Sequence, residues 1–190
     1  MNRTRLFLIA IGLFVVTAFI VSVAIPGGQR TTAPKSAERQ AAQRAAAVKV
    51  EDSVFIIDGE PIGMTNGYAI VLDAPDSAAT VTRIFGVPVL DDLDGDSDLD
   101  AAVMLSKSVP GSGTFYYVAA SIKETSGYRG TEAFLLGDRV APQNVEVNDG
   151  LITANYADRQ PGEPMTTRPS VGVSKYLRVQ GGELKEVPKP

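Results

Sequence analysis

The chain has 190 residues, of which 44% are hydrophobic and 21% are charged, a length and composition that suit one globular domain with some additional sequence. It contains no cysteine and no histidine, which excludes disulfides, thiolate metal sites and catalysis by either side chain. Of its 18 Lys and Arg and its 22 Asp and Glu, seven basic residues and one acidic residue lie in 1–50, which leaves eleven and twenty-one in 51–190. So acidic a region lacks the basic clusters that nucleic-acid phosphates require, and we expect no nucleic-acid partner.

The first element is an uncharged apolar segment at 6–25, which follows Arg3 and Arg5. Twenty residues at about 1.5 Å each span roughly the 30 Å of a bilayer core, so the segment predicts a transmembrane signal anchor behind a cytoplasmic tail at 1–5. The membrane is therefore the first expected partner. The alternative is a signal peptide cleaved near Ala24, because Ser22 and Ala24 have the small side chains that a signal peptidase reads.

Charge alone does not fix the orientation of this anchor. The arginines before it favour a cytoplasmic N-terminus, whereas four basic residues soon after it oppose that orientation: Arg30, Lys35, Arg39 and Arg44. We expect the domain to be extracytoplasmic, in the cell envelope, because an N-terminal signal-like segment normally delivers the chain that follows it.

The segment 26–50 is predicted to be a linker with a short stalk helix. Pro26, Gly27 and Gly28 end the apolar span, and Ser36 is suited to cap a helix that runs through Ala47. The apolar positions of this helix are mostly alanine, so it has little surface to bury.

From 51 to 190 the pattern changes to short apolar runs separated by turn residues, which predicts β-strands. The run at 114–122 is apolar on both faces and is expected to be central in a sheet. Asp149-Gly150, between two alternating runs, is the strongest hairpin signal in the chain. The predicted strands lie at 53–57, 68–72, 79–85, 101–105, 114–122, 145–148, 151–156 and 171–179.

No helix-period segment follows residue 50, and Pro161, Pro164 and Pro169 make 159–170 a surface loop. The predicted fold is therefore all-β. We expect a single antiparallel meander, arranged as a sandwich or a partly closed barrel, behind the transmembrane helix and the stalk.

The densest chemical feature is a run of six aspartates in ten residues, from Asp91 to Asp100, followed at once by the apolar run 101–105. Carboxylates at alternate positions repel one another unless a cation lies among them, and calcium prefers about six to eight oxygen ligands in a flexible cage. Gly95 lets the chain turn inside that cage, and Asp91 is expected to lie outside it. The predicted ligands of a calcium ion are Asp92, Asp94, Asp96, Asp98 and Asp100.

The segment 92–103 resembles the calcium loop of FG-GAP repeats in integrin-α-type propellers, where an acidic loop of this spacing runs into an apolar strand. The resemblance implies bound calcium, with Asp98 contributing its carbonyl oxygen. It is less similar to an EF-hand or dockerin loop, because Val103 replaces the bidentate Glu and Ser97 replaces the usual Gly. The motifs of a broader resemblance, to uncharacterised membrane-anchored bacterial envelope proteins, are this loop, the N-terminal span, 113–117 and 134–140.

These observations favour a binding or structural module of the envelope that is stabilised by calcium, with an envelope protein or a glycan as partner, and not an enzyme. A separate hypothesis is a receptor or assembly partner that acts through Tyr116, Tyr117, Tyr128 and the loop 159–170.

The alternative is an envelope hydrolase that uses acidic residues. Asp92-Leu93-Asp94-Gly95 is similar to the nucleophile motif of haloacid-dehalogenase-type phosphatases, but Asp96 occupies the position of their Thr or Val, and their β/α alternation is missing. The other form of this alternative is a glycosidase in which Glu132 works with an aspartate.

Overall fold

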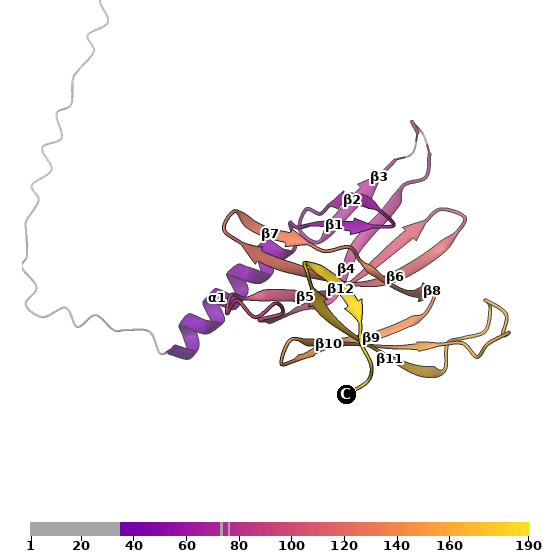
Figure 1. Cartoon of the computed structure of the whole chain (residues 1–190). Coiled ribbons are helices and arrows are strands. Elements are labelled where there is room, and N and C mark those ends of the chain that lie inside the picture. The colour runs from indigo at the N-terminus through magenta and orange to yellow at the C-terminus, as the bar shows by residue number, and fades with distance from the viewer. Residues whose placement is uncertain (1–34, 73, 76) are drawn as a thin grey trace, which may run out of the picture. The chain divides into compact units, whose positions relative to one another are not determined.

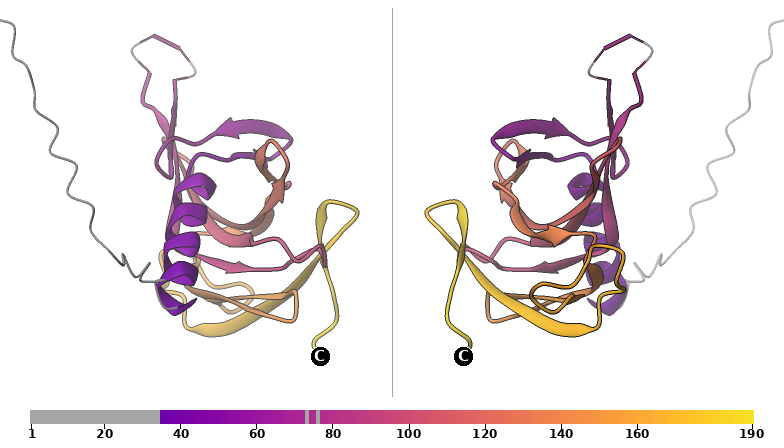
Figure 2. Two further views of the ribbon diagram at one scale, coloured as in Figure 1. Left: turned by 90° about the vertical axis from the view of Figure 1, so that its left-hand side faces the viewer. Right: turned by 90° about the vertical axis from the view of Figure 1, so that its right-hand side faces the viewer.

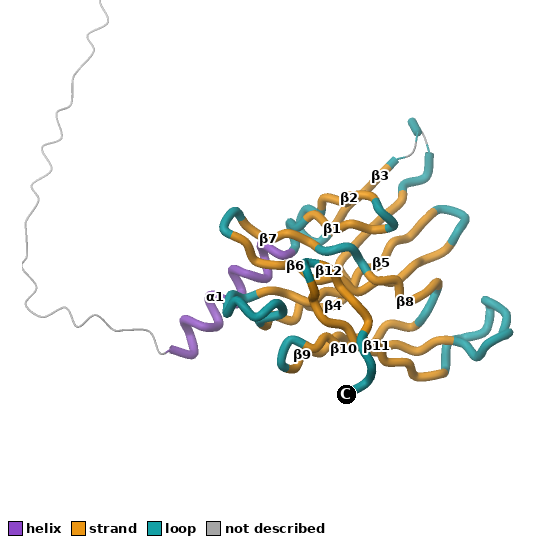
Figure 3. The backbone as a smooth tube through the Cα atoms, viewed as in Figure 1, coloured by secondary structure: helices purple, strands orange, loops and turns teal. Residues whose placement is uncertain are grey.

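The computed structural model describes residues 35–190 except 73 and 76, and these residues belong to one compact unit, Ala33–Pro190. The predicted tail at 1–5 and anchor at 6–25 lie outside the described residues. Among the residues that are described, no helix is both long enough and apolar enough to cross a bilayer. Apart from one helix, the described chain consists of strands and loops (Figure 3), so the predicted antiparallel all-β fold is confirmed.

The largest sheet has six strands, and five of them follow one another as a meander in the order β3-β4-β5-β6-β7. The sixth, β8, pairs with β6 on the same side as β7, but with residues 115–118 of β6, whereas β7 pairs with residues 121–124. The strands are β3 (Tyr68–Val71), β4 (Thr80–Asp91), β5 (Asp100–Val109), β6 (Gly113–Glu124), β7 (Gly127–Gly130) and β8 (Phe134–Asp138) (Figure 1).

A second meander forms a four-stranded sheet in the order β12-β11-β10-β9. Its strands are β9 (Ala141–Asn148), β10 (Leu151–Asp158), β11 (Val171–Gln180) and β12 (Glu183–Glu186). A separate hairpin is formed by β1 (Val54–Ile57) and β2 (Glu60–Gly63). The prediction of a single meander is therefore wrong. Between β8 and β9 the chain turns at Arg139, whose φ is 50°, and leaves the first sheet for the second.

The sheets are stacked in layers, with the four-stranded sheet on one face of the six-stranded sheet and the β1–β2 hairpin on the other (Figure 2). This is a sandwich-like arrangement, and no sheet of the described residues closes into a barrel. Strand β5 is buried on both faces: Ala102 and Met104 contact the first core cluster, whereas Ala101, Val103 and Leu105 contact the second. Strand β6 lies between β5 and β7, which confirms that 114–122 is central.

Helix α1 (Lys35–Val50) begins one residue before the predicted cap, Ser36, and continues three residues beyond Ala47. Most of the helix is exposed, as its alanine-rich sequence predicts. Its last turn is different, because Ala46 is buried and the fully buried Val50 joins Phe55 and Ile57 of β1 in the second core cluster. The end of α1 is thus part of the core of the domain.

Candidate metal centre

The acidic loop connects β4 to β5, and the strand register fixes both of its ends. Asp91 is the last residue of β4 and pairs directly with Asp100, the first residue of β5. Between them the chain turns through two left-handed residues, Gly95 with a φ of 91° and Ser97 with a φ of 72°. Because the ends are held by sheet pairing, the intervening carboxylates are confined to a short, tight turn.

The loop is shaped by hydrogen bonds from backbone N–H groups to its own carboxylates. Asp92 accepts from the N–H of Gly95 at 2.7 Å and from that of Ser97 at 3.0 Å. Asp94 accepts from Asp96 N–H at 3.3 Å, and Asp96 from Asp98 N–H at 2.8 Å. Such local bonds are typical of aspartate in turns, and they help to hold the loop in shape.

Asp100 differs from the other aspartates because it is fully buried. Its Oδ2 accepts from the N–H of Leu93 at 2.9 Å and its Oδ1 from the N–H of Lys123 on β6 at 2.8 Å. Burial raises the pKa of this carboxyl; the two N–H groups oppose that shift, and the charges of Asp94 and Asp96 add to it. A cation beside Asp100 would favour its ionised form and relieve this penalty.

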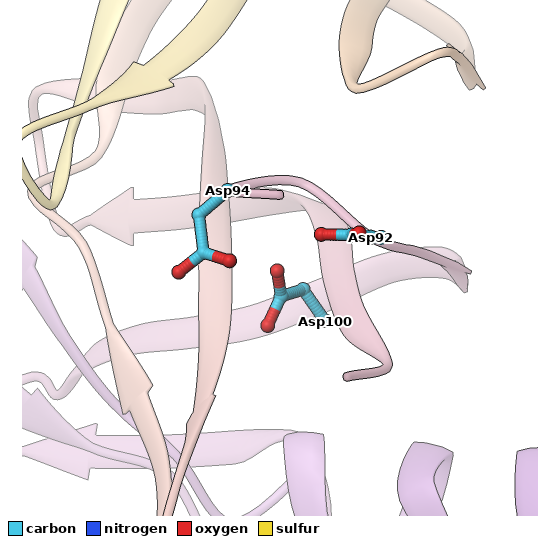
Figure 4. Close-up of side chains that lie close together, drawn as sticks. All are labelled: Asp92, Asp94 and Asp100. Carbon is cyan, nitrogen blue, oxygen red and sulfur yellow. The ribbon is translucent and has the colours of Figure 1, made fainter. Parts of the chain in front are cut away.

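Three of the five predicted ligands come together. One carboxylate oxygen from each of Asp92, Asp94 and Asp100 lies within 4.8 Å of the others, and the three side chains point toward one another (Figure 4). These three residues could hold a metal ion. The exposed Asp96 and Asp98 are not in the group, and Asp91 instead accepts from Asp92 N–H.

The sequence did not indicate what surrounds this group. A cleft with a volume of about 500 Å³ lies beside it, lined by Asp92 and Asp94 on one side and by the β9–β10 turn, Asp149 and Gly150, and Arg178 on the other. Arg178 of β11 donates to the carbonyl oxygen of Asp149 at 2.8 Å. The Asp149-Gly150 signal predicts the hairpin, but no local pattern shows that its turn lies against the acidic loop.

Tyr128 is a second neighbour that the sequence did not connect with the loop. Its hydroxyl donates to the carbonyl oxygen of Leu99 at 2.7 Å, which ties β7 to the last turn of the loop. Partial burial raises the pKa of Tyr128, and the nearby charges of Asp100 and Asp98 raise it further.

The other residues of the competing hypotheses lie away from the carboxylate group; only Tyr128, and Asp92 and Asp94 of the phosphatase-like motif, lie at the loop. Tyr117 is buried in the second core cluster and its hydroxyl donates to Asp58, while Tyr116 meets Phe85 edge-on, with 6.0 Å between the ring centres. Glu132 is exposed, lies at an isolated bridge to Ile56 and is not in the carboxylate group. The segment 159–170 is a loop, as predicted.

The left-handed Ser97 leads to a stability prediction. A non-glycine residue in this conformation costs about 1 kcal/mol, and the Ser97 hydroxyl is not among the groups that make hydrogen bonds in the described chain, so Ser97→Gly should raise the free energy of unfolding by about 0.5–1 kcal/mol. Urea denaturation measures the change. The same substitution at Ser112, a turn residue without a positive φ, is the matched control and should lower stability. Equal losses in the two variants would contradict the assignment of strain to Ser97.

No family model matches the chain, and comparisons with curated proteins and with solved structures gave no match.

Proposed function

We propose that this protein is a membrane-anchored, extracytoplasmic binding or structural module whose β domain is stabilised by a calcium ion at the acidic loop. The observation that supports the proposal is the convergence of Asp92, Asp94 and Asp100 between two strands of the central sheet. Asp96 and Asp98 complete the proposed cage, in keeping with the resemblance of 92–103 to FG-GAP loops.

Calcium is the cation that this chemistry suits best. The donors are all oxygens, which hard cations prefer, and the loop is exposed on one side, so water and backbone carbonyls complete the coordination. Magnesium requires a more rigid octahedron and gives up its water reluctantly. A flexible loop of carboxylates therefore favours the larger ion.

The proposed role of the ion is to join parts of the domain that are distant in the sequence. Asp100 contacts β6 through the N–H of Lys123, and the cleft beside the group is closed by the β9–β10 turn of the other sheet. At a hundredfold excess over its dissociation constant, an ion that binds only the folded state adds about 2.7 kcal/mol to stability. That is a large fraction of the stability of a typical domain.

The proposed location follows from the segment 6–25, which would hold the domain at the outer face of the cell membrane. An envelope protein or a glycan would be its partner. A reporter fused after Pro190 tests this placement, because an enzyme that is active only outside the cytoplasm should be active in the fusion.

A thermal melt of residues 33–190 tests the calcium proposal. About 10 mM calcium should raise the melting temperature by roughly 5–10 °C over chelator, since about 2.7 kcal/mol corresponds to that shift in a domain of this size. Magnesium at the same concentration should give a smaller shift. Equal melting temperatures in calcium and chelator would contradict the proposal.

Three asparagine variants localise the effect. Asp94→Asn should abolish most of the calcium shift, and Asp96→Asn should narrow it, because both residues belong to the proposed cage. The matched control is Asp91→Asn, which removes one charge from the same loop at a residue outside the proposed cage and should leave the shift intact. A loss of the shift in all three variants alike would indicate non-specific screening of charge.

A further inference from the structure

Strand β3 is an edge of the six-stranded sheet, and it lacks the protection that the other described edge strands have. Natural sheets guard their edges with short strands, charges, prolines, bulges or a covering element, and β3, with four residues, has only the first of these. The outer side of β1 is occupied by the bridge from Ile56 to Glu132. The second half of β4 is protected by a register shift that follows Phe85, by Pro88, and by helix α1, which lies beside it. The remaining edge strands carry charged residues: Glu60 in β2, Arg129 in β7, Asp138 in β8, Glu146 in β9, and Glu183, Lys185 and Glu186 in β12.

The pairing of β3 with β4 shows which backbone groups face outward. Gly67 accepts from the N–H of Ile84, and hydrogen-bonded positions alternate along an antiparallel pair, so Ala69 and Val71 also point toward β4. Tyr68 and Ile70 point the other way. Tyr68 exchanges two backbone hydrogen bonds with Thr65, at 2.8 and 3.1 Å. By the same alternation the N–H and C=O of Ile70 face away from β4, and those of Leu72, the residue after the strand, would continue the pattern.

The side chains at this edge are apolar on both faces of the sheet. Ile70 is 62% exposed and Leu72 59% exposed on one face, while Val71 is 42% exposed on the other. No charged residue occurs from Thr65 to Leu72. An uncharged edge with outward backbone groups and exposed apolar side chains is the arrangement that adds a further strand in β-augmentation.

We propose that β3 pairs in antiparallel register with β3 of a second copy of this chain, around a two-fold axis at Val71. In this register Ile70 faces Leu72 of the partner subunit, and their outward N–H and C=O groups form hydrogen-bonded pairs on both sides of the axis. The two Val71 side chains meet on the opposite face. The edge of each copy thus provides hydrogen-bond partners for the outward backbone groups of the other copy and apolar contacts for its side chains. Both copies use the same residues, as an isologous contact requires.

The contact is small, so it requires a second copy that is held nearby. A single short strand pair buries far less than the roughly 1,200 Å² of a stable complex, so the contact is weak between freely diffusing molecules. Tethering to one surface raises the effective concentration of the partner. This step rests on the proposed membrane anchor, which would place every copy on the same face of the bilayer.

A cysteine cross-link tests the pairing, because the natural chain contains no cysteine. In the proposed register, position 71 is a non-hydrogen-bonded pair, whose close Cβ atoms suit a disulfide. Full-length Val71→Cys, reconstituted in phosphatidylcholine vesicles and oxidised, should form a disulfide dimer at least about tenfold faster than Val171→Cys. Val171 is the matched control, since it is a valine on a strand of the other sheet and is 38% exposed. Equal rates would overturn the proposal.

A second substitution shows whether edge pairing causes the cross-link. Ile70→Lys, at a side chain that is 62% exposed, should leave the fold intact and reduce the Val71→Cys cross-linking rate to that of the control. An unchanged rate in the double variant, or a disulfide to a different protein in native membranes, would overturn pairing with a second copy. A failure of the anchor would be seen separately, because the chain would then not enter the vesicles. The cross-link should form equally in calcium and in chelator, so this test does not depend on the calcium proposal.

Discussion

Replacement of Asp100 with alanine is expected to lower the free energy of unfolding by about 2–4 kcal/mol in the presence of chelator. The fully buried Asp100 carboxylate is the acceptor for two backbone N–H groups, those of Leu93 and Lys123. Removal of the acceptor leaves both donors without a partner, and each buried donor that loses its partner costs about 1–3 kcal/mol. The relief of one buried charge offsets only part of that loss. Urea denaturation in chelator measures this loss of unfolding free energy without any contribution from a bound ion.

Two variants separate the structural role of Asp100 from its proposed role as a ligand. Asp100→Asn keeps the size of the side chain and one acceptor oxygen, so it should lose about half as much stability as the alanine variant. Asp94→Asn removes an exposed carboxylate and should cost less than about 0.5 kcal/mol in chelator, although it should abolish most of the proposed calcium shift. If Asp100→Ala and Asp94→Asn were equally stable in chelator, the buried hydrogen bonds would not contribute as we infer.

The carboxylate group illustrates how far the sequence alone could predict the site. The alternate spacing of the aspartates, with a glycine among them, is a local signal, and it correctly indicated the tight acidic turn. The selection of Asp92, Asp94 and Asp100 is not local, because it depends on the register that pairs Asp100 with Asp91 and on the N–H of Lys123 from β6. The neighbouring Arg178 lies on a strand almost eighty residues further along the chain and has no sequence signal.

The same distinction holds for the strands. Asp149 and Gly150 both have positive φ, 49° and 69°, which the hairpin turn requires and which their residue types allow, so this hairpin was predictable. Strand β2 contains Pro61 and Gly63, and β7 is Gly-Tyr-Arg-Gly, so neither has the composition of a strand. They are strands because β1 and β6 supply partners, and that information lies elsewhere in the chain.

Gly130 at the end of β7 gives the second large expected effect, since Gly130→Ala should lower the free energy of unfolding by about 3 kcal/mol. A Cβ at this buried position would collide with the carbonyl oxygen of Val54 and lie 2.6 Å from Cδ1 and 2.9 Å from Cα of Phe55. Two of these three atoms belong to the backbone of β1, which cannot rotate away as a side chain does. The β1–β2 hairpin would have to move off β7, and the fully buried Phe55 would move with it.

Gly63→Ala and Gly172→Ala are the matched controls, because both glycines lie in strands, lack a positive φ and have open space where a Cβ would be. Each should change stability by less than about 0.5 kcal/mol. The comparison isolates the close approach of β1 to β7 from the general effect of alanine in a strand. If Gly130→Ala were as stable as these controls, β1 would not pack directly on β7. That result would be at odds with the second core cluster, because its fully buried members outside the six-stranded sheet are Val50, Phe55 and Ile57, and two of these three belong to β1.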